Sequence, residues 1–201
     1  MSATATSAQE SRVIKLPPPQ TAGAGDLLQA LQSRRSTRAF AARPLSQALL
    51  STLLWAGCGI NRPAIGGRTA PSAHNWQEID VYAALPDALY RYDAAAHALT
   101  LAVAKDLRPL TGVQDFVATA PLNLVYVADF ARMTDAGDAD RTFFAATDAA
   151  VIAQNVYLAC AALNLAVVVR GLVDRRTLAP AMELRAKQRI VLAQTVGFPA
   201  A

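Results

Sequence analysis

The sequence predicts an α+β fold in which a central, mostly antiparallel sheet is flanked by helices. Of the 201 residues, 53% are hydrophobic and 17% are charged, which is typical of a folded chain with a large core. Helical and strand-like segments alternate without the spacing of regular βαβ units, and several short strand-like runs follow one another closely. We therefore expect one globular domain over residues 26–201, preceded by an extended arm over residues 1–25.

The N-terminal part of the chain contains the arm and two helices. The arm is rich in Ala, Ser, Thr, Pro and Gly, and its run Pro17–Pro19 excludes a helix or a central strand there. Asp26 is placed to cap a short amphipathic helix that ends in a basic run. Ser46 is placed to cap a second helix, because the apolar residues after it recur at helical spacing. These residues are Leu49, Leu50, Leu53, Leu54 and Cys58.

The rest of the chain predicts a functional loop followed by strands and helices. Residues 57–72 contain four glycines and two prolines, which indicate a long loop. A compact domain keeps such a loop mainly for function, so we expect chemistry near it. Strands are then predicted over residues 79–83, 88–92, 97–101, 122–128, 167–169 and 190–196, with a long helix over 140–163 and a further helix from Asp174.

Composition and missing motifs exclude several classes of function. The formal net charge is +4, yet the basic residues are mostly scattered and lack interleaved aromatics, so we expect no nucleic-acid partner. The apolar stretch 143–165 carries Asp148 and several side-chain amides, which predicts a core helix and no membrane span. There is no P-loop, Rossmann fingerprint or G-x-S-x-G motif. His74 and His97 have no partner at metal-ligand spacing, so we expect no metal site.

The cysteines and the N-terminus give two weaker indications. Cys58 and Cys160 lie in apolar helical patterns, which favours buried thiols over a disulfide or a catalytic thiol. The first twenty residues lack an apolar stretch after a basic start, so they predict no secretory signal. The expected location is the cytoplasm, or an exported compartment if a signal has been removed.

Two short stretches contain the residue types of a ligand site. Arg34, Arg35, Ser36 and Arg38 bring guanidinium groups and a hydroxyl together, as phosphate binding requires, although a solvated basic helix end has the same composition. The stretch Pro71–Asn75 follows the glycine-rich loop, and its small residues and amide allow close approach to a flat ligand. On composition alone, an ordinary turn explains the second stretch equally well.

Together the two stretches resemble the nitroreductase family. The flavin-binding pattern of that family is Arg-x-Ser-x-Arg/Lys near the start, followed by Pro-Ser-x-x-Asn-x-Gln. The resemblance continues through Gln154-Asn155, Arg170-Gly171 and Val196–Pro199, and covers residues 26–199. It implies a nitroreductase-like α/β sandwich that forms an obligate homodimer and holds FMN between its subunits.

Shorter motifs are similar to the SagB-type branch of the family, which includes dehydrogenases that oxidise azolines in modified peptides. They are Ile14–Pro17, Leu54–Gly57, Gly59–Arg62 and Arg68–Ala73. The tyrosine or lysine used for azoline oxidation is not identifiable from these motifs. A stand-alone reductase therefore remains an equally good hypothesis.

The resemblance also implies roles for individual residues. Arg34, Ser36 and Arg38 would hold the FMN phosphate and ribityl, with Arg35 as a near neighbour. From the other subunit, the residues expected against the same flavin are Pro71, Ser72, Ala73 and Asn75. Arg170 and Gly171 match the segment whose backbone amide approaches flavin N5, and Gln114 is a candidate for the polar edge of the ring. Because FMN carries the hard chemical step, we expect no catalytic side chain.

The function expected first is ping-pong hydride transfer from NADH or NADPH, through FMN, to a small-molecule acceptor such as a quinone or nitro compound. A second hypothesis is a flavin dehydrogenase that oxidises a peptide or small molecule. A third is a flavin-binding or flavin-remodelling protein without external redox turnover. It is motivated by the sequence ending at Ala201, whereas family members commonly continue with basic residues that also hold the phosphate.

Overall fold

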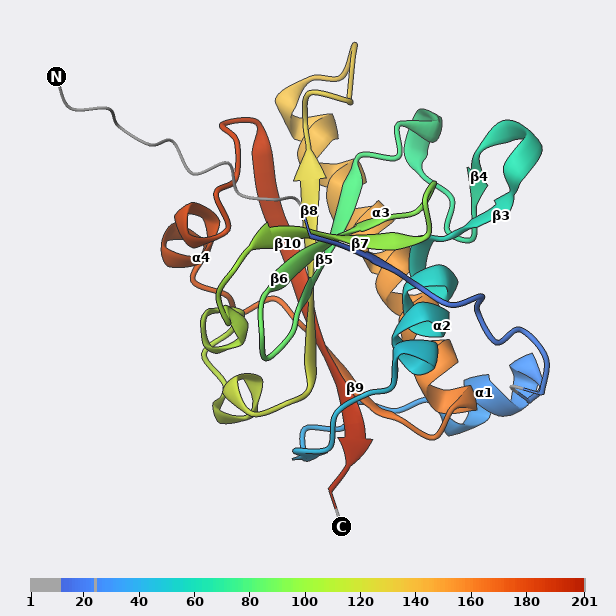
Figure 1. The fold of residues 1–201 in the computed structure, drawn as a ribbon. Coiled ribbons are helices and arrows are strands. Elements are labelled where there is room, and N and C mark those ends of the chain that lie inside the picture. Colours follow the sequence, from blue (N-terminus) through green and yellow to red (C-terminus); the bar gives the residue numbers. More distant parts are fainter. Residues whose placement is uncertain (1–11, 24, 201) are drawn as a thin grey trace, which may run out of the picture.

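A computed structural model describes residues 12–23 and 25–200 and has an α+β architecture. A twisted sheet forms the centre of the molecule, and helices cover it on both sides (Figure 1). In the described residues the order of strands is β1-β7-β6-β5-β8-β10-β2, and β9 also pairs with β10. Every strand pair in this part of the chain is antiparallel, which confirms the predicted architecture.

The helices and strands have the following bounds. The strands are β1 (Val13–Lys15), β2 (Phe40–Ala41), β3 (Ile60–Arg62), β4 (Gly67–Arg68), β5 (Ile79–Ala84), β6 (Leu89–Asp93), β7 (Ala98–Val103), β8 (Leu122–Asp129), β9 (Ala166–Arg170) and β10 (Gln188–Pro199). The α-helices are α1 (Leu27–Ser33), α2 (Gln47–Cys58), α3 (Asp138–Ala162) and α4 (Arg175–Ala181). Short 3-10 helices cover Pro63–Ile65, Ala73–Asn75, Arg108–Leu110 and Asp115–Ala118.

The predicted helix caps are confirmed. The carboxylate of Asp26 accepts a hydrogen bond from the amide of Leu28 at 2.7 Å, at the start of α1. The hydroxyl of Ser46 accepts one from the amide of Leu49 at 3.2 Å, at the start of α2. Each cap satisfies a backbone donor that the first helical turn leaves without a partner.

The sequence did not predict the shortest strands. Strand β2 has two residues, and β3 and β4 form a small hairpin inside the segment expected to be a loop. Strand β10 also extends beyond the predicted 190–196, because its last two residues pair with β2. Strands this short show no alternation of apolar and polar residues, so their pairing depends on the neighbouring chain.

The described end of the N-terminal arm is attached to the domain. Strand β1 pairs with β7 at one edge of the sheet. The Pro17 carbonyl accepts a hydrogen bond from the Ser51 hydroxyl at 2.5 Å, and the Nε2 atom of His97 lies 3.1 Å from the same oxygen. Residues 1–11 of the predicted arm lie outside the described residues. The division of the chain into arm and domain stays a prediction.

Two apolar cores lie on the two faces of the sheet. Neighbouring residues of β8 point to opposite faces, as in any strand: Tyr126 joins the core under α2 and α3, and Val125 joins the core under α4. Helix α3 is long and apolar enough to cross a bilayer by length and composition. Its buried residues, however, belong to the first core, as expected for a core helix.

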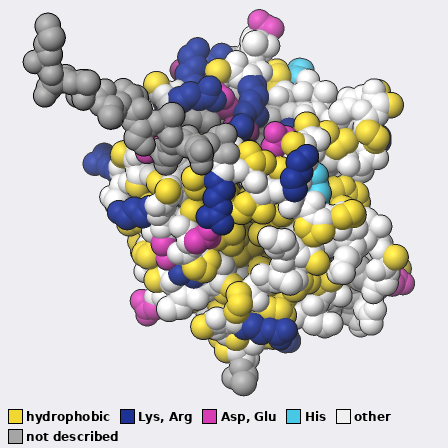
Figure 2. All heavy atoms as spheres, in the orientation of Figure 1, with side chains coloured by type: hydrophobic (Ala, Val, Ile, Leu, Met, Phe, Trp, Pro, Cys, Tyr) yellow, Lys and Arg dark blue, Asp and Glu magenta, His cyan; other side chains and the backbone are white. Residues whose placement is uncertain are grey.

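The surface has no continuous basic stripe on the face shown in Figure 2. Lys and Arg side chains there are interspersed with acidic and hydrophobic ones. A protein that binds the phosphates of nucleic acid usually gathers its basic residues on one face.

Candidate functional site

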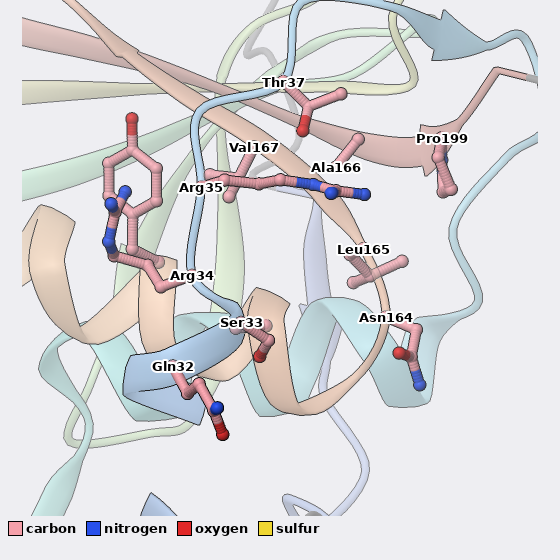
Figure 3. Close-up of a pocket in the computed structure, with 12 residues that line it drawn as sticks. Gln32, Ser33, Arg34, Arg35, Thr37, Asn164, Leu165, Ala166, Val167 and Pro199 are labelled. Atoms are coloured by element: carbon pink, nitrogen blue, oxygen red, sulfur yellow. The ribbon is translucent and has the colours of Figure 1, made fainter. Parts of the chain in front are cut away.

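The basic segment 34–38 follows α1 and runs beside the open edge of β9. The amide of Thr37 donates a hydrogen bond to the Val167 carbonyl at 2.9 Å, which fixes the segment against that strand. Side chains of an extended segment alternate between its two sides. Arg34 and Arg35 accordingly point to opposite sides of the segment (Figure 3).

Tyr157 of α3 connects this segment to the sheet. Its hydroxyl accepts a hydrogen bond from the Val169 amide at 2.9 Å and lies 2.8 Å from the Ser36 hydroxyl. Because the tyrosine accepts from Val169, its own proton can go to Ser36, which leaves the serine proton free for a ligand. The guanidinium of Arg34 lies over the tyrosine ring, 5.4 Å from its centroid. Tyr157 therefore orders two of the predicted phosphate-binding residues.

A cavity of about 470 Å³ adjoins the segment. This volume is within the range of about 300–1,000 Å³ that is typical of small-molecule sites. Arg34, Arg35 and Thr37 line it, together with residues from the end of α3 and the start of β9. Figure 3 shows the Arg35 side chain extending across it toward Pro199. Ser36 and Arg38 do not line this cavity.

The open edge of β9 presents backbone groups in a regular order. The Val167 carbonyl and the Val169 amide both bond away from β10, so the groups of the alternate residues face β10. By this alternation the amide of Gly171, directly after β9, faces the open edge, and the amide of Arg170 faces β10. Of the two residues expected near a flavin ring, Gly171 thus has the available donor.

The side chain of Arg170 is turned into the protein, away from that edge. Its guanidinium donates to the Thr111 carbonyl at 2.7 Å, to the Thr195 hydroxyl at 3.0 Å and to the Asn123 side-chain oxygen at 3.1 Å. Gln114 joins the same network, with its Oε1 atom 3.4 Å from the guanidinium. The network fixes the segment that contains Gln114 against the end of β9.

The second predicted stretch forms a tight turn over α3. The amide of Ala73 donates to the Asp148 carboxylate at 2.8 Å, and the amide of Gln77 donates to the Ser72 hydroxyl at 3.0 Å. Asn75 has a φ of 55°, in the left-handed region that Asn tolerates better than most residues. The conformation of the turn thus favours an Asn at position 75 independently of any ligand.

Within one chain the two stretches do not meet. They contact α3 through Tyr157 and Asp148, which are nine positions apart, or about 13 Å along the helix axis. Pro71 and Ser72 line a different, smaller cavity from that lined by Arg34 and Arg35. In the described chain the two predicted stretches therefore line separate cavities.

A buried carboxyl pair lies under the turn. Glu78 is fully buried, and neither of its carboxyl oxygens has a hydrogen-bond partner. Burial, with a further contribution from the negative charge of Asp148, raises the pKa of Glu78 to about 7. Since Asp148 holds the Ala73 amide, the charge of this pair acts directly on the turn.

The cysteines and carboxylates offer no other chemistry. Cys58 and Cys160 are both free and buried, which confirms the predicted thiols. Burial raises the pKa of Cys58 to about 12, so it is not a thiolate at neutral pH. Among the described residues no group of three His, Cys, Asp or Glu side chains could hold a metal ion.

Comparison with known proteins decides the family. The model of the nitroreductase family matches residues 31–198, which is most of the chain. The chain belongs to the nitroreductase family. A crystal structure of a Ralstonia eutropha protein assigned as a nitroreductase is 48% identical and superimposes with a TM-score of 0.90, over 94% of this chain and 90% of that one.

Two further nitroreductases extend the comparison. A protein of Methanocaldococcus jannaschii, also assigned as a nitroreductase, is 30% identical over 70% of this chain and 76% of its own length. A Desulfovibrio desulfuricans nitroreductase solved in complex with FMN is 24% identical, with a TM-score of 0.64 over 88% of each chain. The second likeness shows the shared fold.

Sequence reasoning missed three residues that connect the predicted site residues to the rest of the fold. Tyr157, Asp148 and Glu78 were not singled out as site residues. A polar side chain inside the apolar pattern of α3 is the one signal that the sequence offered for Asp148 and Tyr157. Glu78 precedes β5 and shows no such signal, because its partners become visible only in the folded chain.

Tyr157→Phe should destabilise the protein by about 1–2 kcal/mol, because the half-buried amide of Val169 loses its acceptor. Urea unfolding at neutral pH measures the change. Ser36→Ala is the matched control: it removes one partner of the tyrosine hydroxyl and leaves the Val169 bond in place. An equal loss of stability in both variants would contradict the bridging role of Tyr157.

Proposed function

We propose that the protein is an FMN-dependent oxidoreductase that accepts a hydride from NADH or NADPH and passes the electrons to a small-molecule acceptor, such as a quinone or nitro compound. One observation carries the proposal: the open edge of β9 has the basic segment 34–38 beside its first residues and the outward amide of Gly171 at its end. Family membership and the FMN complex of the Desulfovibrio relative support it.

The residues on this edge fit FMN. Val167, which anchors the basic segment, and Gly171 are four residues apart, or about 13 Å in a strand. The guanidinium groups of Arg34 and Arg35 and the free proton of Ser36 suit a phosphate. The outward amide of Gly171 suits an acceptor nitrogen on a flat ring, and the absence of a side chain there leaves room for the ring.

Helix α3 supports the proposed homodimer. Between Thr142 and Leu163 the only charged residue is Asp148, and it is buried. The exposed residues of this stretch form one stripe that continues from Phe143, which is 65% exposed. They are Thr142, Phe143, Ala146, Thr147, Ala150 and Gln154. A long exposed stripe without charge is typical of a subunit interface.

In the proposed dimer each flavin site takes residues from both chains. The turn Pro71–Asn75 of the partner would complete the half-site formed by the basic segment and the end of β9. A second subunit is needed for this, because the two half-sites are separated within one chain. The turn is fixed to α3 by Asp148, so docking of the two α3 helices would also place the turn.

The protein groups in this proposal bind and position. When bound, FMN supplies a ring that takes up and releases hydride equivalents. Arg34, Ser36 and Arg38 would hold its phosphate and ribityl, and Gly171 would donate to the ring. Arg170 and Gln114 fix the segment beside the ring. No described side chain in this arrangement needs to act as a nucleophile or general acid.

Two alternatives differ in the reaction. In the first, the protein is a SagB-like dehydrogenase that oxidises a peptide azoline or a small molecule; the short motifs near residues 14–17 and 68–73 favour it. In the second, it binds or remodels flavin without external turnover. Anaerobic mixing with NADPH or NADH separates them from the reductase, because only a reductase loses its flavin absorbance with these donors.

The first test is the absorbance spectrum of the purified protein and the identity of any released chromophore. We expect oxidised FMN at about one per subunit. Arg34→Gln should weaken FMN binding about tenfold or more, since a charged hydrogen bond to a phosphate is worth about 1.5–3 kcal/mol. Isothermal titration of the apoprotein measures this. Lys105→Gln removes an exposed positive charge elsewhere and should leave the affinity unchanged.

A protein that neither contains FMN nor takes it up would disprove the proposed function. Equal losses of affinity in the Arg34 and Lys105 variants would disprove the placement of the phosphate, because they would reflect net charge alone.

A further inference from the structure

Arg170 is a buried cation with no opposite charge beside it in the described part of the chain. The residue is 5% exposed, and none of the ion pairs formed there involves it. All of its hydrogen-bond partners are neutral: the carbonyl and hydroxyl of Thr111 and the side-chain oxygens of Gln114, Asn123 and Thr195. The positive charge is therefore stabilised by neutral hydrogen-bonding groups and is not balanced by a negative side chain.

This burial of a charge is energetically unfavourable, and the surrounding loop fits closely around the guanidinium. Burying an ionised group without a counter-charge is unfavourable, and burial lowers the pKa of Arg170 to about 10, so it still carries its charge at neutral pH. The loop closes tightly over the guanidinium, because a Cβ atom at Gly112 would collide with it. A neutral side chain could fill the same space at lower cost, so the charge itself calls for an explanation.

The backbone of Arg170 lies next to the proposed position of the flavin ring, and its guanidinium lies behind that edge, against Thr195 of β10 and Asn123 of β8. Gly171 directly follows Arg170, and its amide faces the open edge of β9. The Phe116 ring covers the guanidinium with its centroid at 6.0 Å, which keeps water away from that side. In such a water-poor environment a charge acts on its neighbours more strongly than it would at the surface.

We propose that Arg170 is a positioning residue whose buried positive charge favours the reduced form of the FMN bound beside it. This inference rests on the proposed function. The uptake of a hydride brings two electrons and one proton, so the ring gains one negative charge. A fixed positive charge nearby stabilises the reduced ring more than the oxidised ring, and it therefore raises the affinity for reduced FMN selectively.

Two variants separate the charge from the packing. Arg170→Met removes both the charge and the hydrogen bonds. Asn123→Asp keeps the arginine and places a carboxylate against it, at the position of an atom 3.1 Å from the guanidinium. This variant neutralises the site and leaves the clamp on Thr111 in place. Arg176→Gln is the control, since it removes the same charge from an exposed position on α4.

The experiment measures the dissociation constants of oxidised and reduced FMN, under air and under anaerobic dithionite, together with the midpoint potential of the bound flavin. In Arg170→Met and Asn123→Asp we expect the affinity for reduced FMN to fall about tenfold more than that for oxidised FMN. For a two-electron couple this lowers the potential by about 30 mV. Arg170→Lys should retain most of the wild-type difference, and Arg176→Gln all of it.

The outcomes distinguish the inference from the function on which it rests. If Asn123→Asp folds and binds both forms of FMN with unchanged or equally reduced affinity, Arg170 is a structural clamp and the inference is wrong, while the proposed function stands. If the wild-type protein binds no FMN, both fail. A selective loss of reduced FMN in the neutralised variant supports the inference, even if Arg170→Met does not fold.

Discussion

Ala150→Glu should convert the protein from a dimer to a monomer and remove most of its FMN. Ala150 lies on the exposed, uncharged stripe of α3. If this stripe is the subunit interface, the substitution buries a carboxylate without a partner, which costs about 3 kcal/mol or more. Such a cost raises the dissociation constant of the dimer by about two powers of ten. Light scattering across a dilution series measures the dimer, and absorbance measures the FMN retained.

The matched control is Ala139→Glu in the first turn of the same helix. Ala139 is exposed on the same face of the helix, just before the uncharged stripe begins and between Asp138 and Asp140, and a negative charge near a helix N-terminus is favourable. This variant should remain dimeric with its full FMN content. The interface on α3 is wrong if Ala150→Glu stays dimeric at low micromolar concentration. If it becomes monomeric and still holds FMN as tightly as the wild type, the site does not need the partner.

Glu78→Gln should stabilise the protein at alkaline pH and have much less effect at acidic pH. The pKa of Glu78 is raised from 4.5 to about 7 by burial, with a further contribution from Asp148. The folded protein therefore holds a proton that the unfolded chain releases. The stability due to this proton is fully present below pH 4.5 and is lost as the pH rises through 7.

Glutamine resembles the protonated carboxyl group and does not ionise as the pH rises. The stability gained by Glu78→Gln should thus increase by about 2 kcal/mol between pH 5 and pH 8, since one pKa unit corresponds to about 1.4 kcal/mol. Guanidinium unfolding at the two pH values measures it. Glu183→Gln, at an exposed position, should show no such increase. A gain that is equal at both pH values would mean that Glu78 is ionised in the folded protein.

The same experiment reports on the turn over α3. Asp148 holds the Ala73 amide and is the negative neighbour of Glu78. When both carboxyl groups are charged, their repulsion acts on the residue that anchors the turn. The wild-type turn should consequently exchange its Ala73 amide hydrogen faster at pH 8 than Glu78→Gln does, after correction for intrinsic exchange.

Local signals in the sequence were sufficient where the structure is local. Asp26 and Ser46 cap their helices as expected, because a cap involves residues two or three positions apart. The runs that became β5 and β8 were found because they are long and apolar enough to show a strand pattern. Strands β2, β3 and β4 were missed, since two or three residues do not establish a period.

The site was only partly predictable for the same reason. The sequence by itself determined the family, the two candidate ligand-binding stretches and the longer helices and strands, because these depend on residue types at fixed short spacings. Only the tertiary structure decided that Tyr157 joins Ser36 to Val169, and that Arg170 is buried among neutral groups. These contacts join residues as far as 121 positions apart. Packing of the whole chain selects such contacts, and no local pattern encodes them.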